Sequence, residues 1–129
     1  MKKFILASIY IVLSTLVFSS QAQNYPSKPV KLIIPQAAGG ATDVFARYVG
    51  QKLSLIWNQP VVTENKVGAA GVVGTDLVAK SAPDGYTLLL TYAGSQAVNP
   101  SLYPKIPLDS VKDFQTVATV ATTPFFLVV

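Results

Sequence analysis

Residues 30–43 read VKLIIPQAAGGATD. The first five form a hydrophobic run with a single polar residue, which is typical of a strand buried on both faces of a parallel sheet. The small residues after it form a loop that leads into a segment with helical spacing. Because the first amides of a helix lack partners and its dipole adds positive charge there, such a loop attracts anions. The stretch therefore predicts a strand, an anion-binding loop and a helix.

An amphipathic helix is predicted after this loop, ending at residues 58–60. Thr42 or Asp43 would cap its start. Its inward face is expected to carry the apolar residues that recur at helical intervals, namely Phe45, Tyr48, Val49, Leu53 and Ile56. A short β-branched strand follows at 61–63.

The remaining elements repeat this order. A small-residue loop at 64–71 leads into a helix over about residues 71–81, with Val73, Leu77 and Val78 facing inward. A turn by composition then precedes a strand at 86–91, a third loop at 92–96 and a short helical stretch at 98–103. A proline-broken connection and two more strands, at 114–120 and 125–129, complete the expected elements.

Three strand–loop–helix units in a row favour an α/β fold with a parallel sheet. Their loops all follow the carboxyl ends of strands, which is the edge where open α/β sheets bind ligands. The convergence of three such loops predicts a binding site more strongly than one loop alone.

The N-terminus has the three-part layout of a secretory signal peptide: Lys2 and Lys3, an apolar run over residues 4–18, and Ser20-Gln21-Ala22 as the cleavage signal. Cleavage is predicted after Ala22. The alternative is a membrane-anchoring helix, for which the run is short against the roughly 20 residues that span a bilayer.

Composition excludes several classes of site. The 129 residues suffice for one modest domain, and half of them are hydrophobic. Without Cys or His, the chain can have no disulfide, thiol nucleophile, imidazole metal ligand or histidine base. Removing Lys2 and Lys3 would leave 8 basic and 6 acidic residues, and the basic ones are scattered. Nucleic acid is therefore not an expected partner, and neither a metal nor a cofactor is predicted.

The chain resembles the periplasmic substrate-binding proteins of tripartite tricarboxylate transporters, the Bug or TctC-like receptors. The resemblance runs through the whole segment after residue 24. The motifs that carry it are YPxKP (25–29), LIxP (32–35), GGxTD (39–43), QPVV (59–62), EN (64–65), GAxGxxG (68–74), VAK (78–80), APDGYTL (82–88), NPxLY (99–103) and VKDF (111–114).

This resemblance implies a monomeric, non-catalytic, two-lobed receptor in the periplasm that closes around a small organic acid and delivers it to a membrane permease. Family members are more than twice as long. Residues 23–110 would form the N-terminal lobe, incomplete here, and residues 111–129 would begin the crossover to the second lobe. The chain is thus expected to be truncated and to bind weakly, if at all, on its own.

Twelve residues at the three loops are predicted to contact the ligand: Gln36, Gly40, Ala41, Thr42, Asp43, Ala69, Ala70, Gly71, Ala93, Ser95, Gln96 and Asn99. The resemblance implies that backbone amides and water hold the ligand carboxylate. Gln36 has the alternative of pointing into solvent. Asp43 could instead cap the helix, or could contact the ligand through water or through a ligand ammonium. The small residues at 69–71 could instead serve close packing between strand and helix. Asn99 could instead be a helix cap.

Two other functional hypotheses compete with the receptor. Gly68, Gly71 and Gly74 follow a predicted strand and suggest a dinucleotide-binding enzyme, although their spacing is not GxGxxG and no Walker lysine follows Gly39-Gly40. The other hypothesis is a truncated gene product without function.

Overall fold

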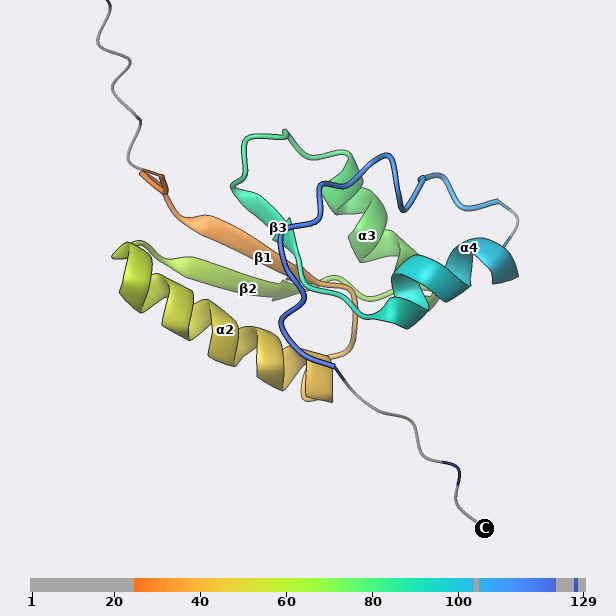
Figure 1. Ribbon diagram of the computed structural model, residues 1–129, viewed down its shortest axis with the longest axis horizontal. Coiled ribbons are helices and arrows are strands. Elements are labelled where there is room, and N and C mark those ends of the chain that lie inside the picture. The colour runs from red at the N-terminus through yellow and green to blue at the C-terminus, as the bar shows by residue number, and fades with distance from the viewer. Residues whose placement is uncertain (1–24, 104, 123–126, 128–129) are drawn as a thin grey trace, which may run out of the picture.

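Three parallel strands form the sheet of the computed structural model, which describes residues 25–103, 105–122 and 127 (Figure 1). They are β1 (Val30–Ile34), β2 (Val61–Asn65) and β3 (Thr87–Leu89), in the order β2-β1-β3. Val30 pairs with Val61 and Lys31 pairs with Thr87. The predicted α/β fold with a parallel sheet is confirmed, while the predicted signal peptide lies outside the described residues.

β1 is the centre of the core, as its hydrophobic run predicts. Four of its five side chains are buried and only Lys31 is exposed. Leu32 and Ile34 pack with Ala46 of the helix that follows β1, and Val61, Leu88 and Leu90 surround this cluster. Ile33 is out of phase with them and points to the opposite face of the sheet.

Helix α2 (Ala41–Trp57) confirms the predicted helix, but only part of its predicted inward face, because Phe45, Val49 and Leu53 are half-buried. The buried residues are Asp43, Ala46 and Gly50, whereas Tyr48 and Ile56 are exposed. The reason is close approach to the sheet, since a Cβ at Gly50 would lie 3.2 Å from Thr63 Cγ2. The helix therefore turns its small residues, rather than its largest apolar ones, toward the strands.

The helix between β2 and β3 also turns small residues toward its neighbours. A 3-10 turn, η1 (Ala69–Gly71), leads into α3 (Val72–Ala79), in which Gly74 and Thr75 are buried. The predicted inward positions of Val73 and Leu77 are wrong, because both side chains are exposed, and Val78 is half-buried. A Cβ at Gly74 would lie 2.6 Å from the Lys66 carbonyl oxygen, so the glycine face must be the one against the loop.

After β3 the chain forms a π-helical segment, η2 (Gly94–Val98), and the short helix α4 (Asn99–Leu102). The predicted strand at 114–120 is wrong: this stretch has no regular structure and runs past the sheet without pairing with it (Figure 1). A strand requires a partner edge, and its β-branched residues, such as Val117, are exposed instead. Of the strand predicted at 125–129, only residue 127 is described.

The amino edge of the sheet is closed by three aromatic rings. The ring of Tyr25 lies 5.9 Å from that of Trp57 and 5.2 Å from that of Tyr86. The Tyr25 hydroxyl donates to the Gly85 carbonyl at 2.6 Å, and Lys28 pairs with Asp84 at 3.1 Å. These contacts tie the segment before β1 to the turn before β3.

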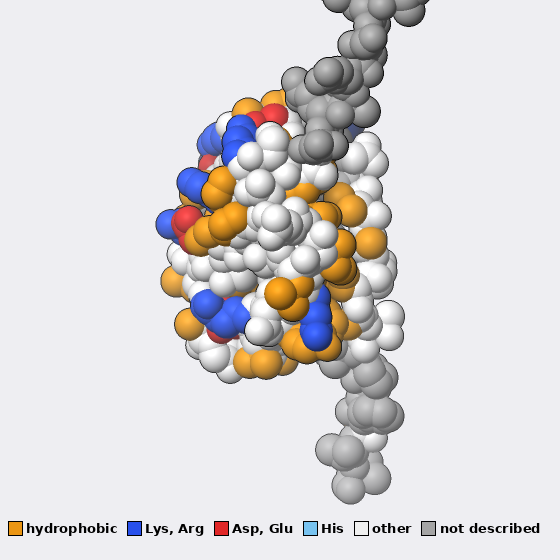
Figure 2. Space-filling view, turned by 90° about the vertical axis from the view of Figure 1, so that its left-hand side faces the viewer, with side chains coloured by type: hydrophobic (Ala, Val, Ile, Leu, Met, Phe, Trp, Pro, Cys, Tyr) orange, Lys and Arg blue, Asp and Glu red, His pale blue; other side chains and the backbone are white. Residues whose placement is uncertain are grey.

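The surface over the last turns of α2 and the amino ends of the strands mixes apolar and charged side chains (Figure 2). Its Lys and Arg side chains lie apart from one another rather than in one basic patch. Among the residues described, no helix has both the length and the apolar character needed to cross a membrane.

Candidate functional site

The carboxyl ends of the three strands meet at one edge, because the strands are parallel. From the central β1 the chain passes through α2 to β2 on one side, and then through α3 to β3 on the other side (Figure 1). The connections thus diverge between β1 and β3. Open α/β sheets bind ligands in the crevice at such a switch point.

Gln36 and Ser95 connect the first and third loops at this switch point. Gln36 Nε2 donates to Ser95 Oγ at 3.3 Å, so this side chain does not extend into solvent. Ser95 is only 5% exposed. A Cβ at Gly71 would lie 2.8 Å from Ser95 Oγ, which brings the second loop to the same point. Three of the predicted site residues, one from each loop, are therefore neighbours.

The side chain of Asn99 is hydrogen-bonded to the backbone of the second loop. Its Nδ2 donates to the Ala70 carbonyl at 2.8 Å, and the residue is 7% exposed. Ala69 and Ala70 have φ angles of 45° and 55°, in the left-handed region that side chains disfavour. The Asn99 contact helps to hold this strained backbone. Asn99 therefore makes an internal polar contact.

The predicted cap of α2 is wrong: the N-cap is Gly40, not Thr42 or Asp43. The helix begins earlier than expected, at Ala41, which places Asp43 in its first turn. The Asp43 carboxylate instead contacts the loop before the helix, where the Gly39 amide donates to its Oδ2 at 2.9 Å. Gly40 has no side chain with which to bind the first amides of the helix.

Two polar residues outside the predicted set complete the surroundings of Asp43. The Arg47 guanidinium pairs with its carboxylate at 3.0 Å, and Asn65 Nδ2 donates to Oδ1 at 2.9 Å. Asn65 Nδ2 also lies 3.0 Å from the Gln36 carbonyl. The sequence signals for these partners are the four-residue spacing from Asp43 to Arg47 and the position of Asn65 at the end of β2.

These donors lower the pKa of Asp43 to about 2, the largest causes being the hydrogen bonds from Arg47, the Gly39 amide and Asn65. Because this pKa lies below that of an unfolded aspartate, the carboxylate stabilises the fold above about pH 4, and this contribution is lost as the pH falls toward about 2.

We predict that Asp43→Asn lowers the urea midpoint at neutral pH, and that its difference from wild type shrinks as the pH falls toward about 2. Unfolding curves at several pH values measure this. The pKa values of Asp84 and Asp109 are lowered too, so the variant should keep some acid sensitivity. A difference that stayed constant with pH would contradict the assignment.

The five remaining predicted site residues differ in their exposure to solvent. Gly40, Ala41 and Ala93 are exposed, while Thr42 and Gln96 are half-buried. The Gly40 amide makes only a long contact, 3.5 Å, with the Ala37 carbonyl.

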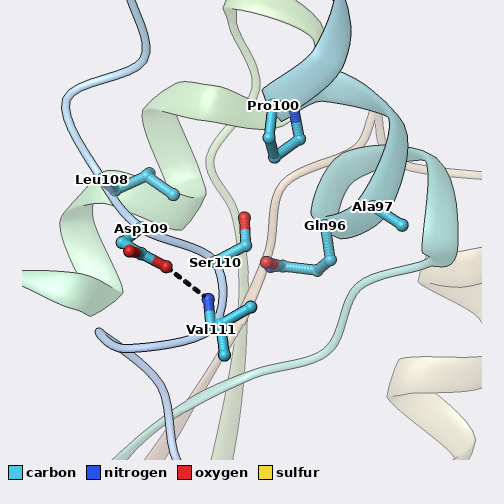
Figure 3. Close-up of a pocket in the computed structure, with 7 residues that line it drawn as sticks. All are labelled: Gln96, Ala97, Pro100, Leu108, Asp109, Ser110 and Val111. Carbon is cyan, nitrogen blue, oxygen red and sulfur yellow. Dashed lines mark hydrogen bonds between the residues drawn. The ribbon is translucent and has the colours of Figure 1, made fainter.

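An open pocket of about 440 Å³ lies beside η2 and α4, lined by Gln96, Ala97, Pro100, Leu108, Asp109, Ser110 and Val111. The Gln96 side chain points toward Ser110, and Asp109 accepts from the Val111 amide (Figure 3). Within the described part of the chain, the buried oxygens Gln36 Oε1, Gln96 Oε1 and Ser110 Oγ have no hydrogen-bond partner. The first loop, the third loop and the segment at Ser110 therefore each present a polar atom that a ligand or water can satisfy.

A Bug protein is among the curated proteins that are similar in sequence. The chain is 43% identical to the protein BugT of Bordetella pertussis over 121 residues, which are 93% of this chain and 37% of BugT. It thus spans little more than a third of the length of this curated relative.

Solved structures share the fold. The periplasmic binding protein BugD superposes with a TM-score of 0.66 at 42% identity, over 70% of this chain and 30% of BugD. MatC of Rhodopseudomonas palustris with bound malate gives a TM-score of 0.67 at 36% identity, over 70% and 31% of the two chains. R. palustris Rpa4515 with adipate gives 0.65 at 34% identity, over 67% and 29%.

The family model described as tripartite tricarboxylate transporter family receptor matches residues 45–129. The match covers helix α2 from its second turn, both later strands and the loops that follow them. This description is of transporter receptors rather than of enzymes. The chain therefore belongs to the tripartite tricarboxylate transporter receptor family.

Proposed function

We propose that this chain forms one wall of the carboxylate site in a periplasmic solute receptor that passes its ligand to a membrane permease. In this proposal residues 1–22 are a signal peptide, residues 23–110 belong to the N-terminal lobe, and residues 111–129 begin the crossover to a second lobe. The receptor acts as a monomer and needs no cofactor.

The observation that carries the proposal is the convergence of three strand-end loops at the switch point between β1 and β3. Gln36, Gly71 and Ser95 mark this convergence by their direct contacts. The arrangement of parallel strands and diverging connections is the one in which open α/β sheets bind small ligands.

The start of α2 supplies the chemistry for an anion. Its first amides, at Ala41, Thr42 and Asp43, lack acceptors within the helix, and the Gly40 cap places no side-chain oxygen on them. A 17-residue helix adds its dipole at this end. A ligand carboxylate can therefore take the position that a serine or aspartate cap would otherwise fill.

Two structural relatives support the class of ligand. MatC holds malate and Rpa4515 holds adipate, both of which are aliphatic dicarboxylates. We therefore propose a small di- or tricarboxylate as the ligand of the receptor. Because this chain supplies one wall only, it should bind such an acid with millimolar rather than micromolar affinity.

We predict that malate and adipate shift the amide resonances of the ¹⁵N-labelled chain chiefly at residues 39–42, 69–71 and 93–96. Titration followed by NMR detects millimolar binding. Trp57 fluorescence would not serve, because this ring lies in the aromatic cluster at the amino edge. The matched control is the dimethyl ester of malate, which has the same carbon skeleton without charge.

The proposal fails if the ester shifts the same amides as the acid, or if neither acid shifts them. NAD should leave the spectrum unchanged. A response to NAD but to no acid would favour the dinucleotide hypothesis. The close contacts of Gly71 and Gly74 already give these glycines a packing role that needs no nucleotide.

A further inference from the structure

We propose that Arg47 is a positioning residue for the carboxylate site: it cancels the charge of Asp43 and, through Asn65, holds the first loop in its receptive shape. This inference rests on the proposed function and names the residues that tune the same site. None of these residues needs to touch the ligand.

Asp43 creates an electrostatic problem at the start of α2. Its carboxylate belongs to the first turn, beside the amides proposed to receive the ligand, and the residue is only 3% exposed. Water therefore screens this charge poorly. An uncompensated carboxylate in this position would repel an incoming anion and compete with it for the same positive helix end.

Four donors occupy the two oxygens of this carboxylate. Oδ2 accepts from the Gly39 amide at 2.9 Å and from Arg47 Nε at 3.1 Å. Oδ1 accepts from Asn65 Nδ2 at 2.9 Å and lies 3.0 Å from Arg47 Nη2. Since a carboxylate offers about four lone-pair sites, Asp43 has none left for a ligand ammonium. Its role is therefore internal.

Arg47 is fixed by strand β2 as well as by Asp43. Its Nη1 donates to Thr63 Oγ1 at 3.1 Å, and its Nη2 donates to Asn65 Oδ1 at 2.8 Å. The planar guanidinium can make all these contacts at once, which a lysine ammonium cannot do with the same geometry.

Asn65 carries the network into the first loop. The Nδ2 group that contacts Asp43 also donates to the Gln36 carbonyl at 3.0 Å. The backbone of the loop is thereby fastened at Gln36 by Asn65 and at Gly39 by Asp43. Charge cancellation and loop shape consequently depend on the same three side chains, those of Asp43, Arg47 and Asn65.

The test compares a single and a double variant of the full chain with wild type, with malate as the probe and amide shifts as the readout. Arg47→Gln leaves the Asp43 charge uncompensated and should weaken malate binding roughly tenfold. Asp43→Asn combined with Arg47→Gln removes both charges and should restore affinity to within about threefold of wild type. Lys52→Gln, which removes a charge from an exposed position on the same helix, is the matched control and should change affinity less than about twofold.

Recovery in the double variant distinguishes charge cancellation from simple loss of structure, because that variant lacks the ion pair too. Equal affinity of Arg47→Gln and wild type would overturn the inference, as would a double variant no better than Arg47→Gln. Circular dichroism spectra of all variants identify any that fail to fold.

A measurement without ligand separates this inference from the proposed function. Hydrogen exchange at the Gly39 amide should be slow in wild type and at least about tenfold faster in Arg47→Gln. If wild type bound no acid but showed this protection, the proposed function would fail while the loop-fastening role of the network stood. Fast exchange in wild type would overturn the network itself.

Discussion

The Ile34→Ala variant is expected to lose about 4 kcal/mol of unfolding free energy. Ile34 is 0% exposed and belongs to the cluster with Leu32 and Ala46 between β1 and α2. Truncation removes three carbon atoms from a packed site and leaves a cavity that the central strand cannot collapse to fill. Small domains have a total stability of only about 5 to 15 kcal/mol, so the loss should bring the chain close to unfolding.

Urea unfolding followed by Trp57 fluorescence measures this loss, because Trp57 lies in the aromatic cluster that closes the amino edge. The matched control is Ile56→Ala, the same chemical change at a side chain that is 75% exposed on α2. It should alter stability by less than about 0.5 kcal/mol. Similar losses in the two variants would show that the core is not where the burial of β1 places it.

Gly74→Ala is the second change with a large expected effect, a loss of about 2 to 3 kcal/mol. In a helix this substitution should by itself be favourable by about 1 kcal/mol. Here the new methyl group would lie 2.6 Å from the Lys66 carbonyl and 3.0 Å from Pro35 Cα. Both neighbours are backbone atoms, so the helix and two strand-end loops must move apart.

Gly50→Ala provides the comparison, since it is the same substitution inside a helix. Its methyl group would meet Thr63 Cγ2 at 3.2 Å and Val61 Cγ1 at 3.4 Å, which are side-chain atoms that can shift. Its stability should stay within about 1 kcal/mol of wild type. Urea midpoints of the two variants decide the matter: if Gly74→Ala is as stable as Gly50→Ala, the tight contact between α3 and the loops is not present in solution.

Much of the fold could be predicted from local sequence. The hydrophobic run of β1, its bounding prolines and the periodicity after it were sufficient for a parallel sheet with crossover helices. The inward faces of the helices were only partly predictable in this way. Hydrophobic periodicity favours large side chains as contacts, whereas Gly50 and Gly74 bring the helices so close to their neighbours that small residues must face them.

The candidate site was predictable at the level of loops but not of contacts. Parallel strands bring their carboxyl ends together, so the loops containing Gln36, Gly71 and Ser95 had to be neighbours. The role of Asp43 depended on where α2 begins: the cap lies three residues earlier, at Gly40, so Asp43 forms an internal ion pair with Arg47 instead of capping the helix. Such a partner choice follows from three-dimensional geometry that residue spacing only suggests.

The strand order has a consequence for the time course of folding. β1 is synthesised first, yet one of its two neighbours is distant in sequence: Lys31 pairs with Thr87, 56 residues later. Non-local pairings of this kind raise the contact order and slow folding relative to helical proteins. Among the strands that the structure describes, the most apolar one thus keeps an open edge until residue 89 has been synthesised.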